Sequence, residues 1–411
     1  MVGIKGQGMT ALAGLLAAHG KRITGSDISE EFSTDAVLRK LGIQVGRFQE
    51  KSITKKIDLV VRSSAYGDTH IEIAKARKLG MSVMDYSDAV AELFNTKRGI
   101  LVTGTHGKTT TTALIGTMME DADLDPSVLV GATVKRWKRN ARVGKGEWMV
   151  AEGDEYQQKF LPLCPEVLVV TSIEYDHPDF FKTKKQYVGA FQKLVARLPV
   201  NGLLVAEEHL KPILKKIPCK VMWYGIAGKG EGRHMELNTK AALCVATYLR
   251  ISMQKAKRSL SAYEGTSRRM EFYTKPSAPT VVIDDYAHHP TEIQTTLAAV
   301  RRQYPKHLIT ALFQPHTYSR THALMSDFAR AFGHADEVIL LPVYSSARER
   351  KEDFPKNLME RLLQKIPVPD KKMFSFPETI QHCRLLPHTK QKRVIITLGA
   401  GDGWQIAKAL A

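Results

Sequence analysis

A glycine-rich segment carries the clearest chemical signal in this sequence, reading Thr-Gly-Thr-His-Gly-Lys-Thr-Thr over residues 103–110. The apolar run at 100–103 predicts a buried strand before it, and the pattern at 108–120 predicts a helix after it. At such a junction, backbone N–H groups and the positive end of the helix dipole point at one spot. The segment therefore predicts a phosphate-binding loop.

The residue types in this loop suit a nucleotide phosphate. Gly104 and Gly107 let the backbone approach the phosphate closely. Lys108 can reach the outer phosphates, and the Thr109 hydroxyl can ligate Mg²⁺. The strict pattern has a glycine where Val102 stands, so a tight turn with a chance Gly-Lys-Thr is the plain alternative. The flanking strand and helix favour the phosphate loop.

Two acidic clusters, Glu152–Glu155 and Glu174–His177, come at the ends of the next predicted strands. Because ligands of open α/β sheets bind beyond the C-terminal ends of the strands, both clusters should face the phosphate loop. Carboxylate oxygens suit Mg²⁺, and an imidazole can add a ligand. Either cluster alone is equally consistent with solvated loop carboxylates. Together, behind a phosphate loop, they favour metal-assisted phosphoryl transfer.

Two further polar clusters lie in the last third of the chain, at Asp284–Pro290 and Phe313–Thr321. Each follows directly on a predicted strand, and each is dense in histidine, aspartate, threonine or arginine. Ordinary helix capping, by Asp285 or Thr291 for example, is the structural alternative for the first cluster. The presence of the second cluster favours a substrate site.

Short apolar runs that alternate with helical patterns must position these residues, which predicts parallel, helix-flanked sheets of the α/β class. New units begin near residues 96 and 268, so we expect domains over 1–95, 96–267 and 268–411. The expected strands are 22–25, 58–61, 100–103, 148–151, 167–170, 281–283, 308–313, 338–341 and 394–398.

The composition of the 411 residues excludes a disordered or low-complexity protein, because 43% of them are hydrophobic. A net charge of +18 suits an anionic partner. The basic residues are scattered and no nucleic-acid-binding motif is present, so we expect no specific nucleic acid. The four cysteines form no metal or disulfide pattern, and no apolar run approaches the ~20 residues of a membrane span. We expect a soluble, cytoplasmic protein without a membrane partner.

In their order along the chain, these segments resemble the Mur ligases, the ATP-dependent amide-forming enzymes of peptidoglycan precursor synthesis. The resemblance covers nearly the whole chain, and the ordered series is far more specific than any one member. It is carried by Gly3–Met9, Gly25–Asp27, Ser63–Ala65, Gly104–Thr110, Glu152–Glu155, Asp176–His177, Arg268–Arg269, Asp284–Ile293, Phe313–Thr321 and Leu398–Asp402.

The resemblance implies three α/β domains: a Rossmann-like UDP-binding domain, a shortened central domain with the parallel sheet of a P-loop ATPase, and a Rossmann-like C-terminal domain. It implies ligation of L-alanine to the carboxylate of UDP-N-acetylmuramate, with ATP and Mg²⁺, by a monomer or weak dimer. ATP would convert the carboxylate to an acyl phosphate, which the amine then attacks.

The resemblance also implies roles for individual residues of this chain. The UDP-sugar and the reacting groups would contact Gly6, Gly8, Asp27, Ser63, Ser64 and His316. ATP would contact Gly104, Thr105, Gly107, Lys108, Thr109, Thr110, Asn238 and Asp285. The magnesium ligands would be Thr109, Glu152 and His177. The catalytic groups would be Lys108, His177, Arg269, His288, His289 and Arg320, with the general base left open among the histidines.

The chain departs from the family pattern in places, and alternatives remain. The segment from Tyr224 to His234 is short by some tens of residues, as if a small β element were missing. Thr317 replaces a common arginine. One rival is a recycling ligase that joins a tripeptide to the same UDP-sugar, towards which Glu152–Tyr156 leans. Another is a non-catalytic protein that binds the nucleotide sugar without turnover.

Overall fold

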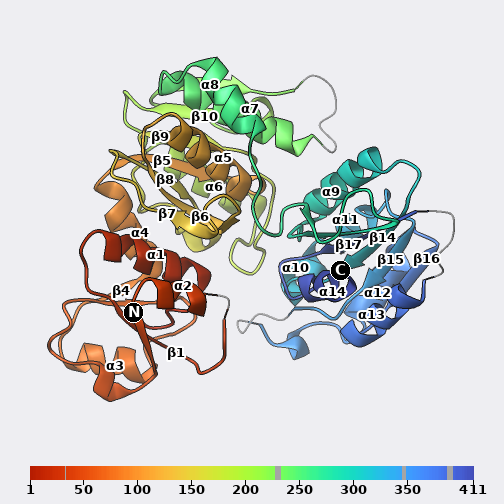
Figure 1. The fold of residues 1–411 in the computed structure, drawn as a ribbon, viewed down its shortest axis with the longest axis horizontal. Helices are drawn as coiled ribbons and strands as arrows, with labels where there is room; N and C mark the ends of the chain where they lie inside the picture. The colour runs from red at the N-terminus through yellow and green to blue at the C-terminus, as the bar shows by residue number, and fades with distance from the viewer. Residues whose placement is uncertain (33, 227–232, 345–348, 387–391) are drawn as a thin grey trace. The chain divides into compact units, whose positions relative to one another are not determined.

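The computed structural model describes residues 1–32, 34–226, 233–344, 349–386 and 392–411. The chain forms two compact units (Figure 1). The first unit comprises Met1–Ile173, Gly189–Gly225 and Asn238–Thr266. The second unit comprises Glu174–Val188, Ile226–Leu237 and Ser267–Ala411. The chain therefore crosses between the units several times, and neither unit is one continuous stretch of sequence.

The first unit begins with short parallel strand pairs, β1 with β2 and β3 with β4. Val2 bridges both pairs, because it pairs in parallel with Ser26 of β1 and with Arg62 of β3. The strands are β1 (Thr24–Asp27), β2 (Gln44–Arg47), β3 (Val60–Arg62) and β4 (Val83–Asp85). The helices are α1 (Gln7–Ala18), α2 (Asp35–Lys40), η1 (Glu50–Ser52), α3 (Ile71–Lys78) and α4 (Tyr86–Asn95).

The central sheet of the first unit has the strand order β11-β10-β9-β5-β8-β6-β7. Its pairs are parallel except for β7, which runs antiparallel to β6 at the edge. Its strands are β5 (Arg98–Thr103), β6 (Ser127–Val134), β7 (Arg139–Arg142), β8 (Trp148–Glu152), β9 (Val167–Val170), β10 (Leu203–Glu207) and β11 (Lys220–Tyr224). The central strands β5 and β9 are apolar and almost wholly buried, which is typical of a parallel sheet covered on both faces.

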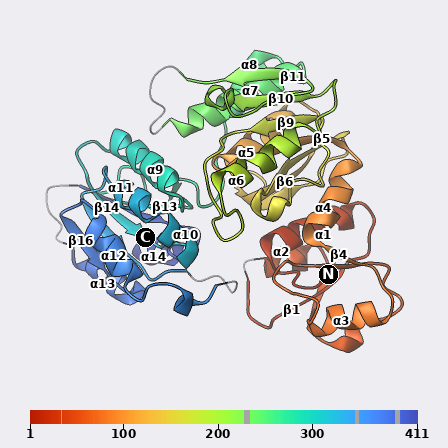
Figure 2. The same cartoon turned by 180° about the vertical axis from the view of Figure 1, so that it is seen from behind.

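Helices of the central region pack on this sheet, and α5 contacts β5, β6 and β8 (Figure 2). The helices are α5 (Lys108–Asp121), η2 (Tyr156–Gln158), α6 (Lys184–Val195), η3 (Glu208–Leu210), α7 (His234–Tyr248) and α8 (Met253–Ser261). The first turns of α6 and α7 belong to the second unit and their remaining turns to the first.

The second unit contains a six-stranded sheet of order β12-β13-β17-β14-β15-β16, parallel except for β12. Its strands are β12 (Glu271–Phe272), β13 (Thr280–Asp285), β14 (Leu308–Phe313), β15 (Glu337–Leu340), β16 (Asp370–Met373) and β17 (Arg393–Leu398). Its helices are α9 (Pro290–Gln303), α10 (Tyr318–Ala323), α11 (Met325–Arg330), η4 (Lys351–Asp353), α12 (Leu358–Lys365), α13 (Phe376–Leu385) and α14 (Trp404–Leu410). The core beneath the sheet centres on Phe313, Phe328 and Phe332, none of them exposed.

The α/β class predicted from the sequence is confirmed, and every expected strand is present. The two N-terminal strands begin two residues later than expected, at Thr24 and Val60. The predicted shortening after Tyr224 falls partly on residues 227–232, which lie outside the described residues; β11 ends at Tyr224 and α7 begins at His234. The boundaries at 95/96 and 267/268 stay predictions.

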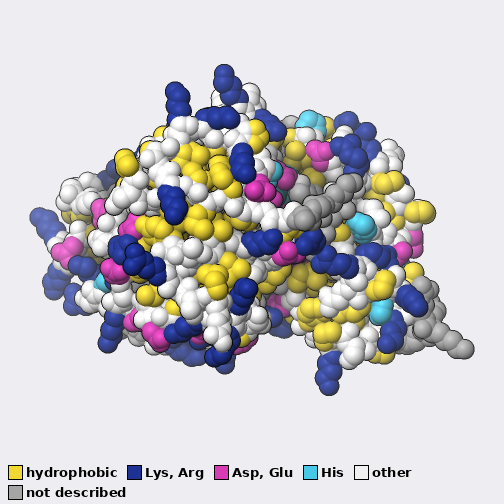
Figure 3. Space-filling view, turned by 90° about the horizontal axis from the view of Figure 1, so that it is seen from above, with side chains coloured by type: hydrophobic (Ala, Val, Ile, Leu, Met, Phe, Trp, Pro, Cys, Tyr) yellow, Lys and Arg dark blue, Asp and Glu magenta, His cyan; other side chains and the backbone are white. Residues whose placement is uncertain are grey.

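The remaining general features of the structure are its helix lengths, its cysteines and the distribution of charge on its surface. Within the described ranges, no helix is long and apolar enough to cross a membrane. All four cysteines are free thiols. Figure 3 shows lysine and arginine side chains dispersed over the face in view, among hydrophobic and acidic ones, without one continuous basic patch on that face.

Candidate active site

The loop that was predicted to bind phosphate lies between the end of β5 and the start of α5, so the flanking strand and helix are where the sequence placed them. Its two glycines have positive φ angles, +134° at Gly104 and +78° at Gly107. A Cβ atom on Gly104 would fall 2.2 Å from the hydroxyl of Thr171, and one on Gly107 would fall 2.6 Å from the side-chain oxygen of Asn238. Both the backbone conformation and the lack of space therefore require glycine at these positions. The second contact also brings Asn238, the predicted adenine neighbour, beside the loop.

Hydrogen bonds hold the loop to Thr171 and Ser172, the two residues that follow β9. Thr105 N–H donates to the carbonyl of Ser172 at 3.0 Å, and His106 N–H donates to the Ser172 hydroxyl at 2.9 Å. Thr171 donates its hydroxyl to the carbonyl of His106 at 2.5 Å. These bonds fix the backbone of the loop before α5, whose first turn carries Thr110.

The Lys108 ammonium lies folded over this loop. It donates to the carbonyls of Gly104 and Thr105 at 2.5 and 3.1 Å. It also pairs with the carboxylate of Glu155 at 3.0 Å. Burial lowers the pKa of Lys108, but the neighbouring carboxylates, Glu155 first, raise it above its ordinary value. The lysine is therefore a fixed positive charge in the loop.

Two of the three predicted magnesium ligands lie together. The Thr109 hydroxyl donates to Glu152 Oε1 at 2.9 Å, and Glu152 Oε2 accepts the backbone N–H of Gly131 at 2.7 Å. A hydroxyl and a carboxylate oxygen are the hard donors that Mg²⁺ prefers, so this pair fits the ion. The third predicted ligand, His177, belongs to the second unit, so its part in the set stays a prediction.

In the second unit, a buried ion pair joins two segments that lie far apart in the sequence. Arg320 donates to both carboxylate oxygens of Asp176, at 2.8 and 3.2 Å, and each side chain is only 5% exposed. Burial would raise the pKa of Asp176, but Arg320 and His177 hold it well below its usual range. The pair fixes Arg320 at the start of α10.

Two histidines lie beside this pair. Arg320 contacts His316 Nδ1 at 3.1 Å, and the rings of His316 and His288 lie 6.1 Å apart. Burial, the larger cause, lowers the pKa of His288 to about 3 and that of His316 to about 4, where Arg320 adds to the effect. Both imidazoles are therefore uncharged at neutral pH, and Arg320 supplies the positive charge of the cluster.

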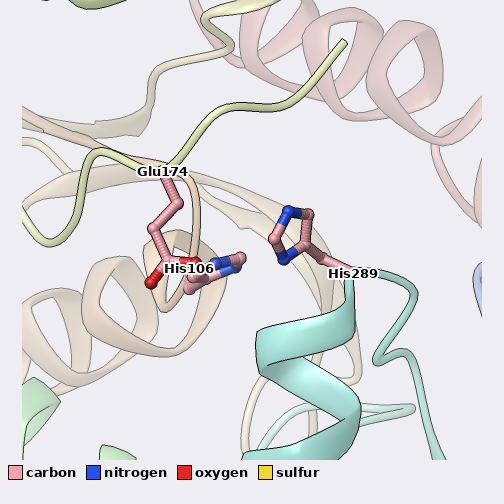
Figure 4. A group of neighbouring side chains, drawn as sticks. All are labelled: His106, Glu174 and His289. Atoms are coloured by element: carbon pink, nitrogen blue, oxygen red, sulfur yellow. The ribbon is translucent and has the colours of Figure 1, made fainter. Parts of the chain in front are cut away.

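His289 has a structural role that the sequence analysis did not assign to it. Its side chain accepts the N–H of Thr291 at 3.3 Å and caps α9, together with Glu292 in a capping box. Helix capping, the structural alternative for this cluster, is therefore present, but it is provided by His289 and not by Asp285 or Thr291. Figure 4 shows Glu174 on the segment after β9 and His289 at the start of α9. Glu174 accepts the hydroxyl of Thr291 at 2.6 Å.

Asp285 and Arg269 lie in the same unit, near Tyr286. Asp285 is buried and accepts the backbone N–H groups of Met270 and Ala287 at 2.8 and 2.9 Å. Burial raises the pKa of Asp285 despite the opposing charge of Arg269. The Arg269 guanidinium lies 5.1 Å from the centre of the Tyr286 ring, a cation–π distance.

Of the described residues predicted to bind the UDP-sugar in the first unit, Asp27 lines a cavity and the others do not. Asp27 lines a cavity of about 380 Å³ at the end of β1, and it accepts the backbone N–H of Lys5 at 2.7 Å. Gly6 caps α1, and a Cβ on Gly8 would fall 2.8 Å from the Tyr86 hydroxyl. Among described residues, the lining of this cavity does not include Gly6, Gly8, Ser63 or Ser64.

Three residues that contact predicted site residues were missed by the sequence analysis: Glu155, which pairs with Lys108; Asp176, which pairs with Arg320; and Tyr86, which packs against Gly8. The first two lie inside acidic clusters that were singled out. Only the folded chain shows which basic residue each one faces. Nothing in the sequence around Tyr86 points to Gly8.

Three family descriptions match successive parts of the chain. They are the Mur ligase family catalytic domain over residues 1–98, the Mur ligase middle domain over 102–257, and the Mur ligase glutamate ligase domain over 268–401. The chain belongs to the Mur ligase family, which confirms the resemblance and the three-domain fold class.

Within the family, the chain is 36% identical over 445 residues to the UDP-N-acetylmuramate–L-alanine ligase of Desulfitobacterium hafniense, covering 100% of this chain and 98% of the relative. It is 33% identical to the ligase of the same name from Bdellovibrio bacteriovorus, covering 98% and 96%. Among solved structures, the UDP-N-acetylmuramate-alanine ligase of Thermotoga maritima matches with a TM-score of 0.79 at 25% identity, covering 100% of this chain and 97% of that one. A murein peptide ligase of Psychrobacter arcticus shares the fold, with a TM-score of 0.73 at 21% identity and the same coverage.

Proposed function

We propose that this protein joins L-alanine to the carboxylate of UDP-N-acetylmuramate, with ATP as the energy source, in peptidoglycan precursor synthesis. The observation that carries the proposal is the full-length identity of 36% to a ligase of that name. The three sites that this reaction needs have matching features in the chain: a cavity beside Asp27, a phosphate loop with Lys108, and the polar cluster around Arg320.

At the phosphate loop, the residues suit the activation of a carboxylate by ATP. The backbone of 104–107 surrounds the phosphates, and Lys108 neutralises the negative charge that gathers on the transferring phosphoryl group. Thr109 and Glu152 would hold Mg²⁺, and the bound ion would polarise the phosphate oxygens. Transfer of the terminal phosphoryl group to the muramate carboxylate gives an acyl phosphate, whose phosphate group is a good leaving group.

His177 is the third proposed magnesium ligand. We expect His177→Ala to raise the Mg²⁺ concentration needed for half-maximal activity by roughly ten- to a hundredfold, as for loss of a contact around a metal. A magnesium titration of the variant beside wild type measures this. An unchanged titration would remove His177 from the ligand set.

The cluster of the second unit suits the incoming amino acid. Arg320 offers guanidinium N–H donors to a carboxylate, and Asp176 orients the guanidinium through two hydrogen bonds. His288 and His316 are neutral at physiological pH, so their ring nitrogens can accept or donate hydrogen bonds to the amine without adding charge. Attack of the amine on the acyl phosphate forms the amide and releases phosphate.

Phosphate release tests the proposal directly. The protein is supplied with ATP, Mg²⁺ and UDP-N-acetylmuramate, and L-alanine, L-serine, glycine or the recycled tripeptide is added in separate reactions. Release that depends on L-alanine supports the proposed ligase. Release only with the tripeptide supports the recycling ligase. No release in any reaction, with UDP-sugar binding intact, supports the non-catalytic alternative.

Because the nucleotide substrates belong to the cytoplasm, we place the enzyme there.

A further inference from the structure

All the hydrogens of the Lys108 ammonium are engaged within the phosphate loop. An ammonium has three donors and no acceptor. Two point at the carbonyls of Gly104 and Thr105, at 2.5 and 3.1 Å, and the third points at Glu155 Oε1 at 3.1 Å. The other carboxylate oxygen of Glu155 lies 3.0 Å from the same nitrogen. A phosphate that binds to Lys108 must therefore replace at least one of these partners.

The Glu155 side chain is buried beside the phosphate loop, on a stretch of backbone that is fixed to β5. Its side chain is 1% exposed. The acidic loop that carries it is tied to β5, because Gly153 N–H donates to the carbonyl of Val102 at 2.8 Å and Thr103 donates its hydroxyl to Gly153 at 3.0 Å. These bonds fix the backbone of the acidic loop beside the phosphate loop, so Glu155 can leave Lys108 by a change of its side-chain rotamer alone.

The two acidic residues of this loop have different partners. Glu152 binds the Thr109 hydroxyl and a backbone N–H, which suits a metal site. Glu155 instead faces the ammonium that is expected to bind phosphate. A carboxylate shares its charge and its acceptor oxygens with a phosphoryl group, so it can take the same hydrogen bonds from a lysine.

We propose that the Glu155 carboxylate occupies the place on Lys108 that the terminal phosphoryl group of ATP takes when the nucleotide binds. Glu155 therefore competes with ATP for the ammonium until the nucleotide displaces it. This autoinhibitory contact rests on the proposed nucleotide site. It lowers the affinity of the empty loop for triphosphate and helps the phosphate products leave after turnover. Lys108 stays oriented throughout, because one anion exchanges for another.

Binding of a non-hydrolysable ATP analogue to the full chain tests this exchange. Glu155→Gln keeps the size of the side chain and removes its charge. We expect it to bind the analogue more tightly by at least about threefold, because the ammonium loses its competing anion. AMP, which has no outer phosphates, should bind equally well to wild type and variant. A structural defect would instead weaken both ligands.

Asp154→Asn is the matched control, because it also removes one negative charge, at the residue directly before Glu155. Its side chain is 54% exposed and pairs with Lys159 instead of Lys108. We expect its affinity for the analogue to stay within twofold of wild type. Glu155→Asp serves as a second variant: it keeps the charge but shortens the side chain, and we expect an affinity between wild type and Glu155→Gln.

The outcomes separate the inference from the proposed function. Equal or weaker binding of the analogue by Glu155→Gln overturns the inference and leaves the ligase proposal intact. A raised magnesium requirement in this variant also overturns it, because Glu155 would then be a metal ligand. If wild type fails to bind the analogue at all, the nucleotide site itself is wrong, and both proposals fall.

Discussion

Replacing Asp176 by asparagine should destabilise the second unit more than replacing any exposed carboxylate close to Asp176. Asp176 and Arg320 are each 5% exposed and share two hydrogen bonds. The variant leaves the buried guanidinium without a counter-charge. Removing one partner of such a pair costs about 3–5 kcal/mol of unfolding free energy. For a unit of this size, about 3 kcal/mol lowers the unfolding temperature by roughly 6–12 °C.

Thermal unfolding of the full chain, followed by calorimetry, measures this effect. Asp179→Asn is the control, because it removes an exposed carboxylate nearby and should change stability by less than about 0.5 kcal/mol. Arg320→Met combined with Asp176→Asn should recover much of the loss, with a coupling energy of about 2 kcal/mol or more. If Asp176→Asn unfolds at the same temperature as Asp179→Asn, the pair does not stabilise the unit as argued.

Three further predictions concern the loop, the UDP site and the second sheet. Lys108→Ala should lower phosphate release at least about 100-fold and leave UDP-sugar binding within twofold; normal release would refute the phosphate loop. Gly8→Ala, at the predicted UDP site, should lower the free energy of unfolding by about 1–3 kcal/mol, because its methyl group would strike Tyr86, and Gly8→Ala with Tyr86→Ala should regain part of that stability in urea unfolding. Burial raises the pKa of Glu337, but its hydrogen bonds, that of Lys372 first, lower it below its ordinary 4.5. This stabilisation is therefore present above pH 4.5 and lost as the pH falls through the lowered pKa, so the urea midpoints of wild type and Glu337→Gln should differ at pH 7 and converge in acid. A difference independent of pH would show that the charge of Glu337 is irrelevant.

The sequence predicts features whose determinants are neighbours along the chain. The phosphate loop is one, because strand, glycines, lysine and helix lie within about twenty consecutive residues. The central strands are another, because β5 and β9 are short, continuous apolar runs. The N-terminal strands were placed two residues early, because β1 has few apolar residues and its ends are set by pairing with Val2 and β2.

Features that depend on distant residues could not be predicted. Lys108 and Glu155 lie 47 positions apart, and Arg320 and Asp176 lie 144 apart. The spacing of residues within a short stretch of sequence does not indicate which carboxylate will pair with which basic side chain. The cap of α9 shows a related limit: aspartate and threonine are the usual capping residues, but the backbone at His289 has the extended conformation that a cap requires.

The discontinuity of the second unit has a consequence for how the protein is made. Asp176 is synthesised 144 residues before Arg320, the cation that neutralises it. At translation rates of about 5–20 residues per second, the segment 174–188 waits many seconds before its own unit exists. A fragment that starts at Ser267 would never receive this carboxylate. The C-terminal part is therefore incomplete on its own, because its buried Arg320 depends for its counter-charge on a short segment from the middle of the chain.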